Sequence, residues 1–245
     1  MSRSLIRRLL AGTSRVVPLD ALLQLSQRVT GAVAGLVFVR DWRLEAFGRP
    51  QFFKHRIDLS RWTSEPYRWS FTARGVYARE SMFKGCRVLD LCCGDGSYSY
   101  LFFSDIAGRI DAVDNDPDAV AYARRHFAAT AIEYHKLDIV REPLPAGDYD
   151  VVVWNAAICY FHQAEIHQIL DKIIAASKPT MLLNGMLPRA NGWVDHKTEF
   201  NDGAAVSQFL RQHFAQVTVR EVDEGSVVSF YFQARSPLRN ERVHS

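Results

Sequence analysis

The residues best placed to do chemistry are Asp90, Gly94 and Gly96, in the stretch CRVLDLCCGDGSYSYLFF at residues 86–103. An apolar run that predicts a buried strand includes Asp90 near its end, and apolar residues at helical spacing resume after Gly96. The glycine turn between them lets a ligand approach bare backbone, with amide N–H groups and the positive end of a helix directed at it. The stretch therefore predicts a ligand-binding turn.

The position of Asp90 favours a positively charged ligand. A dinucleotide-binding turn follows the pattern Gly-x-Gly-x-x-Gly, and Ser99 stands where its third glycine would be. A carboxylate four residues before Gly94 is a poor neighbour for a pyrophosphate. The same carboxylate would attract the sulfonium and the amino group of S-adenosylmethionine. We therefore expect S-adenosylmethionine rather than a nicotinamide dinucleotide.

The elements that must position this turn alternate along the chain from residue 86 onward. The pattern gives strands at RVLDLC, RIDAVD, IEYHKLD, YDVVVWNA and TMLLNGML, and helices at GSYSYLFFSD, DPDAVAYARRHF, QAEIHQILDKIIAAS and GAAVSQFLRQHF. Asp116 is the expected cap of the second helix, with Pro117 near its first position. Two successive strands, QVTVREV and SVVSFYFQA, follow and predict an antiparallel edge. We expect an α/β fold: a Rossmann-like, doubly wound, mostly parallel seven-stranded sheet with an antiparallel C-terminal edge hairpin.

We divide the chain into an N-terminal helical extension (1–60), a main domain (61–236) and a C-terminal tail (237–245). The first part of the main domain, residues 61–80, is aromatic and basic. It fits either ordinary core packing or a lid over a ligand.

The N-terminal extension has three interpretations. Its apolar positions fit a helical cap on the domain, or a helix lying on a membrane surface. Its opening is also rich in Arg and Ser and lacks an acid until Asp20, as in a cleaved mitochondrial targeting segment. The apolar run at 31–39 is too short to span a bilayer.

Composition excludes several classes of protein. The chain has 48% hydrophobic and 23% charged residues, as soluble globular proteins do. A net charge of +3 gives no argument for nucleic acid binding. The four cysteines form no C-x-x-C pair, so we expect no structural zinc, reduced thiols and a cytoplasmic location.

Over roughly residues 75–235 the chain resembles the class I S-adenosylmethionine-dependent methyltransferases. Their first motif is an apolar strand, an acid and Gly-x-Gly-x-Gly. Here Asp90, Cys92, Gly94 and Gly96 match it, with cysteine in place of the first glycine. A small side chain still lets the methionine part of the cofactor approach the turn.

The resemblance implies S-adenosyl-L-methionine as the cofactor and assigns further contacts to it. Asp114, an acid ending the second strand, would accept hydrogen bonds from the ribose hydroxyls, with Asn115 against the adenine. Asp138 would accept from the adenine amino group, and Ile139 would stack on the base or offer its backbone N–H. Asn155 lies at the end of the fourth strand, beside the transferred methyl group. Because an amide stands there instead of an acid, we expect no metal.

A finer pattern lies before the first strand, on the fourth strand and late in the chain, at Arg74, Gly75, Val76, Trp154, Asn155, His196, Glu199 and Phe200. This pattern resembles that of methyltransferases of bacterial cell-surface glycan and small-molecule biosynthesis. In many relatives Glu-His-Phe follows the fourth strand, whereas this chain has Cys159, Tyr160 and Phe161, with His162 next. The implied acceptor is a small molecule or a glycan. The sequence indicates no oligomeric state.

An oxygen acceptor needs a base, whereas an amine needs only to be unprotonated. Our candidates for the base are His162 and His196, with Tyr160 as an orienting hydroxyl and Glu199 as a partner of His196. Each histidine also fits a structural role. We expect O-methylation of a sugar or another hydroxylated metabolite. N-methylation and a non-catalytic S-adenosylmethionine-binding or scaffold role stay open.

Overall fold

The computed structural model describes residues 65–190, 195–223 and 228–238, and for residues 65–70 it describes the backbone alone. Contacts divide the chain into two compact units, Met1–Gln51 and Phe52–Ser245, and every described residue belongs to the second. The expected extension over 1–60, the first residues of the candidate lid and most of the expected tail lie outside the described residues.

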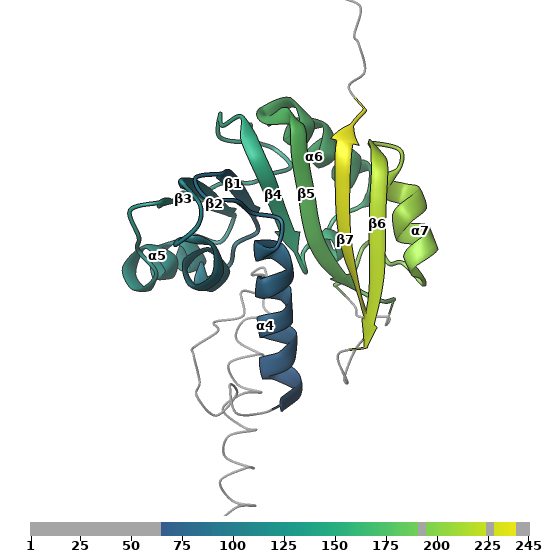
Figure 1. Ribbon diagram of the computed structural model, residues 1–245, viewed down its shortest axis with the longest axis horizontal. Helices are drawn as coiled ribbons and strands as arrows, with labels where there is room; N and C mark the ends of the chain where they lie inside the picture. Colours follow the sequence, from purple (N-terminus) through teal and green to yellow (C-terminus); the bar gives the residue numbers. More distant parts are fainter. Residues whose placement is uncertain (1–64, 191–194, 224–227, 239–245) are drawn as a thin grey trace, which may run out of the picture. The chain divides into compact units, whose positions relative to one another are not determined.

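A seven-stranded sheet forms the centre of this unit, in the order β3-β2-β1-β4-β5-β7-β6 (Figure 1). The strands are β1 (Arg87–Leu91), β2 (Arg109–Asp114), β3 (Ile132–Lys136), β4 (Tyr149–Asn155), β5 (Ser177–Pro188), β6 (Phe214–Asp223) and β7 (Val228–Pro237). Strands β1 to β5 run parallel, and β7 is antiparallel to both β5 and β6. The expected fold class is confirmed, including the antiparallel C-terminal pair.

Helices lie on both faces of the sheet. They are α4 (Glu65–Arg79), the short π-helix η1 (Ser99–Phe103), α5 (Pro117–His126), the 3-10 turn η2 (Ile158–Tyr160), α6 (Gln163–Ala176) and α7 (Gly203–Leu210). Asp116 caps α5 as expected, because its side chain accepts the N–H groups of Asp118 and Ala119. The helix after the glycine turn is shorter than its sequence pattern and continues as a π-helix, a form often found at functional sites.

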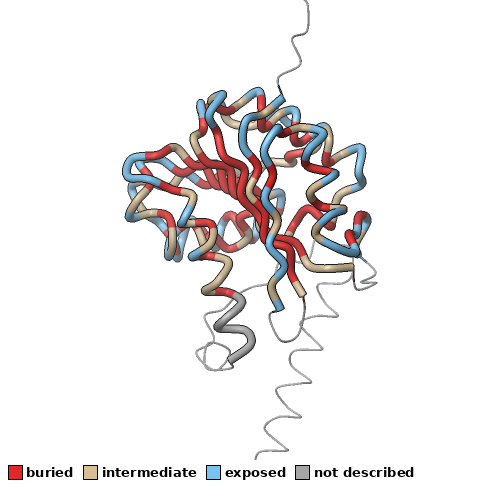
Figure 2. The backbone as a smooth tube through the Cα atoms, turned by 45° about the vertical axis from the view of Figure 1, so that its right-hand side comes forward, coloured by how far each residue is buried: buried red, intermediate tan, exposed pale blue. Residues whose placement is uncertain are grey.

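Strand β4 contributes to a hydrophobic core on each face of the sheet. Val152 and Trp154 belong to the cluster that includes the apolar residues of α6 and α7. Val151 and Val153 belong to the cluster under α5 and η1. This alternation explains why the strand is almost wholly apolar, and Figure 2 shows the buried strands running through the middle of the unit.

The described part of the candidate lid is α4, which packs against the rest of the fold. Phe71 stacks on Tyr98 with ring centres 4.5 Å apart. Asn184 of β5 donates to the carbonyl of Tyr77 and to the hydroxyl of Ser81. These contacts fit core packing for this stretch. None of the helices in the described ranges is long and apolar enough to cross a membrane.

Candidate functional site

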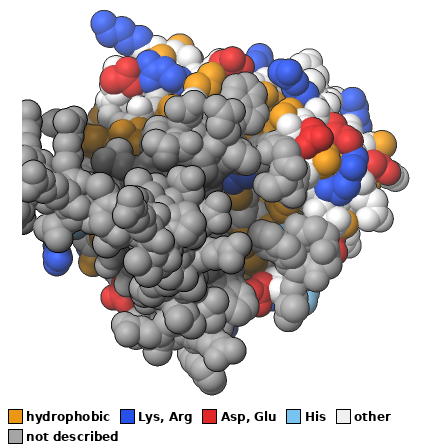
Figure 3. All heavy atoms as spheres, turned by 90° about the horizontal axis from the view of Figure 1, so that it is seen from below, with side chains coloured by type: hydrophobic (Ala, Val, Ile, Leu, Met, Phe, Trp, Pro, Cys, Tyr) orange, Lys and Arg blue, Asp and Glu red, His pale blue; other side chains and the backbone are white. Residues whose placement is uncertain are grey.

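The glycine turn lies at the carboxyl edge of the parallel strands, where open α/β sheets bind ligands. The parallel strands run downward in Figure 1, and Figure 3 views the molecule from that side. Asp90 pairs in register with Ala112 of β2 and Val153 of β4. The ends of these three strands therefore bring Asp90, Asp114 and Asn155 to one edge.

The turn itself depends on left-handed backbone at Cys92, Gly94 and Gly96, with φ of 56°, 57° and 77°. At Gly96 a side chain has no room, because a Cβ there would lie 2.6 Å from the ring of Tyr134. Cys92 stands where the family has its first glycine, and a non-glycine residue in this conformation is strained by about 1–2 kcal/mol. The cysteine therefore adds backbone strain to the turn as well as a larger side chain.

Asp90 is 4% exposed and accepts a hydrogen bond from Ser99, with Oγ 2.5 Å from Oδ2. Burial raises the pKa of Asp90 to about 7, the bond from Ser99 opposes the rise, and the charge of Asp114 adds to it. Among the described residues, no positively charged group is paired with this carboxylate. It suits a cationic ligand that brings one.

Asp114 joins the end of β2 to the turn. Its Oδ2 accepts the N–H of Gly94 and its Oδ1 accepts the N–H of Asp116, both at 2.9 Å. Burial raises the pKa of Asp114, and the two N–H groups oppose the rise. Each carboxylate oxygen has a second lone pair, so the expected ribose contacts remain available. The neighbouring Asn115 is exposed.

The loop after β3 carries Asp138 and Ile139, the two residues expected to contact the adenine. The Oδ1 atom of Asp138 accepts the N–H groups of Val140 and Arg141, so the side chain shapes its own loop. Ile139 is 4% exposed and its side chain belongs to the core. Stacking of Ile139 on an adenine, one of its two expected roles, does not fit this placement. Its backbone N–H is the group left for such a contact.

Asn155 offers the clearest sign that the edge is built for a polar ligand. Its Oδ1 and Nδ2 atoms are both buried, and neither has a hydrogen-bond partner among the described residues. Such groups destabilise a folded protein by about 1–3 kcal/mol each unless something bonds to them. With two acids and a glycine turn beside it, this donor set fits S-adenosylmethionine, which carries cationic, hydroxyl and amino groups.

The acceptor side is formed by the loop after β4 and the segment 195–200. The rings of Tyr160 and His196 meet edge to face at 5.4 Å. His196 Nδ1 lies 3.2 Å from Oε1 of Glu199, and the His196 side chain is 2% exposed. Backbone bonds from Lys197 and Thr198 to the carbonyl of Cys159 hold the segment in place. Tyr160, His196 and Glu199 therefore lie together at this edge.

Residues 88–180 match the family model described as a methyltransferase domain. This stretch is a methyltransferase domain. An uncharacterized methyltransferase of Mycobacterium bovis is 36% identical over 94 residues, which make up 37% of this chain and 42% of that relative. A relative from Mycobacterium tuberculosis matches to the same extent. The chain thus spans less than half the length of the curated relatives that it matches.

Several solved structures have the same fold as this chain. N-methyltransferase NodS from Bradyrhizobium japonicum, solved with S-adenosyl-L-homocysteine, has a TM-score of 0.59 and 15% identity, covering 73% of this chain and 91% of NodS. The 1,6-didemethyltoxoflavin-N1-methyltransferase of Burkholderia thailandensis has a TM-score of 0.60 and 18% identity, covering 84% of this chain and 89% of that one. The expected resemblance to class I methyltransferases is thus confirmed over residues 88–180, and the solved structures share the expected fold.

His162 takes a structural position in the methyltransferase domain. It is exposed at the N-cap of α6, where its backbone N–H donates to Oε2 of Glu165 at 2.8 Å. No contact within the described ranges joins its ring to Tyr160 or His196. Of the two histidines expected as bases, the geometry favours His196.

Sequence reasoning missed the role of Ser99. In the sequence, Ser99 served only as an argument against a dinucleotide, because it stands at the third glycine position. In the structure, its hydroxyl donates a hydrogen bond to Asp90. Its spacing of nine residues from Asp90, across a tight turn, was the available signal.

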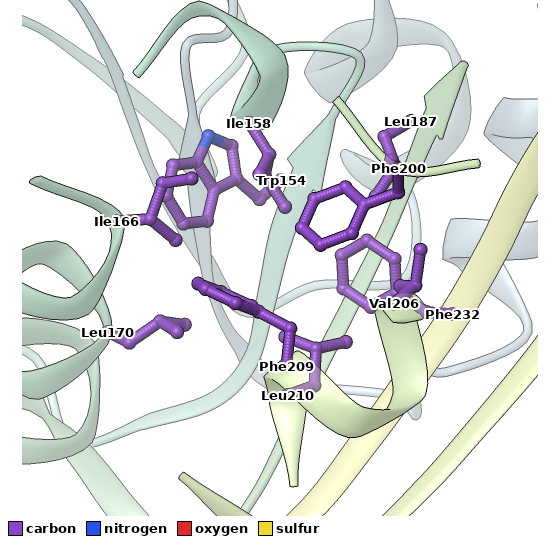
Figure 4. Close-up of a pocket in the computed structure, with 10 residues that line it drawn as sticks. All are labelled: Trp154, Ile158, Ile166, Leu170, Leu187, Phe200, Val206, Phe209, Leu210 and Phe232. Carbon is purple, nitrogen blue, oxygen red and sulfur yellow. The ribbon is translucent and has the colours of Figure 1, made fainter. Parts of the chain in front are cut away.

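Two other features of the methyltransferase domain are not part of the site. Asp111, Glu133 and His135 have ligand-like spacing, but Arg109 already bridges the two acids. A cavity of about 10 Å³ lies among apolar side chains of α6, α7 and the sheet (Figure 4). It has room for about one water molecule and lacks the polar partners that a water needs.

Proposed function

We propose that this protein transfers a methyl group from S-adenosylmethionine to a hydroxyl group of a small polar acceptor, such as a sugar. The observation that carries the proposal is the arrangement of Asp90, Asp114 and the unpartnered amide of Asn155 around the glycine turn. A glycan or metabolite is a better candidate than a nucleic acid, because the net charge is only +3. A cytoplasmic location belongs to the same proposal and agrees with four unpaired cysteines.

The cofactor-binding residues have distinct roles. Asp90 supplies negative charge, Asp114 accepts hydrogen bonds, and the turn at Gly94 permits close approach of the backbone. When bound, S-adenosylmethionine supplies a methyl group activated by the positive charge on sulfur. Much of the rate would then come from holding the acceptor close to that methyl group.

The acceptor side provides a base of defined tautomer. With Nδ1 of His196 donating to Glu199, the lone pair of the ring lies on Nε2, which accepts the hydroxyl proton. Burial raises the pKa of Tyr160 to about 12, so its hydroxyl stays protonated and can only donate or accept a hydrogen bond. Because the side chain of His196 is 2% exposed, the atoms that cover it must move before an acceptor reaches the ring.

That burial also favours a second candidate, an amine acceptor. An unprotonated amine attacks without a base, so it requires no access to His196. Two of the solved structures with this fold are N-methyltransferases by name. A third candidate is a protein that binds S-adenosylmethionine without catalysis, and the experiment must distinguish it from the two methyltransferases.

Calorimetry with S-adenosylhomocysteine and with NAD tests the cofactor half of the proposal. We expect binding of the first and none of the second. Incubation with methyl-labelled S-adenosylmethionine and fractionated cell extract then tests activity. Label on a base-stable ether product supports O-methylation, and label on an amine supports the second candidate. Binding of S-adenosylhomocysteine without label in any fraction would favour a non-catalytic role.

A further inference from the structure

We propose that Ser99 is a positioning residue that keeps Asp90 ionised and oriented, and so sets the pH below which the domain releases S-adenosylmethionine. This inference rests on the proposed function, because it assigns Asp90 to the cofactor.

The side chains of Asp90 and Ser99 form a buried pair. Asp90 lies inside the sheet, with β2 on one side and β4 on the other, and is 4% exposed. Ser99 is the first residue of η1 and is 0% exposed. Its hydroxyl donates to Oδ2 of Asp90 at 2.5 Å, a short distance typical of a hydroxyl bonded to an ionised carboxylate. Because Ser99 is fully buried, water cannot easily replace its hydroxyl.

In the described ranges, the titratable groups that interact with Asp90 are all acids or neutral groups. They are Asp114 from β2, the thiols of Cys92 and Cys93 in the turn, and Tyr134 from β3. None of them provides a positive charge. The hydroxyl of Ser99 is therefore the group that favours the ionised form, while burial and Asp114 favour the protonated form.

The affinity for the cofactor therefore depends on whether Asp90 is protonated. The cationic groups of S-adenosylmethionine interact favourably with ionised Asp90 and much less with its neutral form. Since burial raises the pKa of Asp90 to about 7, affinity should fall as the pH drops below about 7. Loss of a hydrogen bond to a charged group should raise that midpoint by about 1–2 pH units.

The experiment measures S-adenosylhomocysteine affinity by calorimetry from pH 5.5 to pH 9 in the wild type and three variants. Ser99→Ala removes the donor, Ser99→Cys keeps the shape with a weak donor, and Ser99→Thr keeps the hydroxyl. We expect the alanine midpoint about 1–2 units above that of the wild type, the cysteine midpoint between them, and recovery with threonine. At pH 7 the alanine variant should bind about 10-fold more weakly, and near pH 9 the gap should close.

A second measurement does not depend on cofactor. Carbon-13 NMR of the apo protein follows the Asp90 carboxyl against pH, with Asp90→Asn identifying the signal. A higher midpoint in Ser99→Ala supports the role of Ser99 in keeping Asp90 ionised even if the protein binds no S-adenosylhomocysteine, a result that would overturn the proposed function and the link to cofactor release. An unchanged midpoint in a folded variant, or an affinity loss equal at every pH, would show that Ser99 has only a packing role.

Discussion

The Nδ1 atom of His167 lies 2.7 Å from Nε2 of His213, so two imidazole rings share one hydrogen bond between α6 and the turn after α7. The rings are stacked at 5.0 Å, and Asp171 lies 3.5 Å from the other nitrogen of His213. One proton occupies the space between the rings, so the pair is not compatible with two imidazolium ions. Burial lowers the pKa of His213, Asp171 opposes this change, and His167 adds to it.

We predict that this pair makes stability depend on pH. A lowered pKa for His213 means that the unfolded chain takes up a proton before the folded one does. The contribution of neutral His213 to the stability of the fold is therefore complete above about pH 6.5 and is lost as the pH falls below that value. Urea unfolding of the wild type and of His213→Gln should differ by about 1 kcal/mol at pH 7.5, and the difference should shrink toward pH 5. His126→Gln, an exposed change, is the control; a constant wild-type–variant difference at all pH values would contradict the prediction.

Asp90→Asn should stabilise the protein in the absence of cofactor. The pKa of Asp90 is raised from 3.8 to about 7, so the unfolded chain releases this proton first. Stability then falls as the pH rises from about 4 to about 7. The asparagine removes this effect, so the variant should gain up to about 4 kcal/mol at pH 8 and little at pH 4. Thermal melts at the two pH values measure the gain, and calorimetry should show weaker S-adenosylhomocysteine binding.

Asp114→Ala should weaken S-adenosylhomocysteine binding by about 2–4 kcal/mol, because it removes charge-assisted hydrogen bonds. The side chain also accepts the N–H of Gly94, so Asp114→Asn, which keeps one acceptor, should lose less. Calorimetry gives the affinities. The matched control is Asp148→Asn, at an exposed position before β4, which should bind normally. Normal affinity in a folded Asp114→Ala would remove Asp114 from the cofactor site.

His196→Ala should lower turnover about 100-fold or more and leave S-adenosylhomocysteine binding intact. His162→Ala should keep near-normal turnover, since its ring lies at the exposed start of α6. Glu199→Gln should show a smaller loss, because the amide no longer fixes the orientation and the tautomer of the His196 ring. Rates are measured on the acceptor identified by labelling. If His196→Ala retains its turnover across pH, an amine acceptor becomes the better account.

Cys92→Gly should preserve or slightly raise stability, since glycine adopts the φ of 56° without strain. Cys92→Val should lose about 2 kcal/mol or more, because a branched side chain is poorly tolerated in this conformation. Urea denaturation compares the two. Equal stability of both variants would show that the left-handed conformation at Cys92 relaxes without cost.

The sequence by itself determined the features that depend on neighbouring residues. Alternating apolar patterns specified the strands and the class of fold, and the Asp116–Pro117 pair specified where α5 begins. The acid and the glycines of the turn identified the cofactor, because their spacing lies within one strand–turn–helix unit. These features follow from local conformational preference and from hydrophobic period, which act over a few residues.

Tertiary structure alone decided which side chains meet and which are buried. Tyr160 and His196 are 36 residues apart, and His167 and His213 are 46 apart, so only the packing of loops and helices brings them together. The same packing distinguishes His196 from His162, which no local pattern could rank. Within the described part of the chain, it also leaves the amide of Asn155 without a hydrogen-bond partner and raises the pKa of Asp90, since burial is a property of the whole fold.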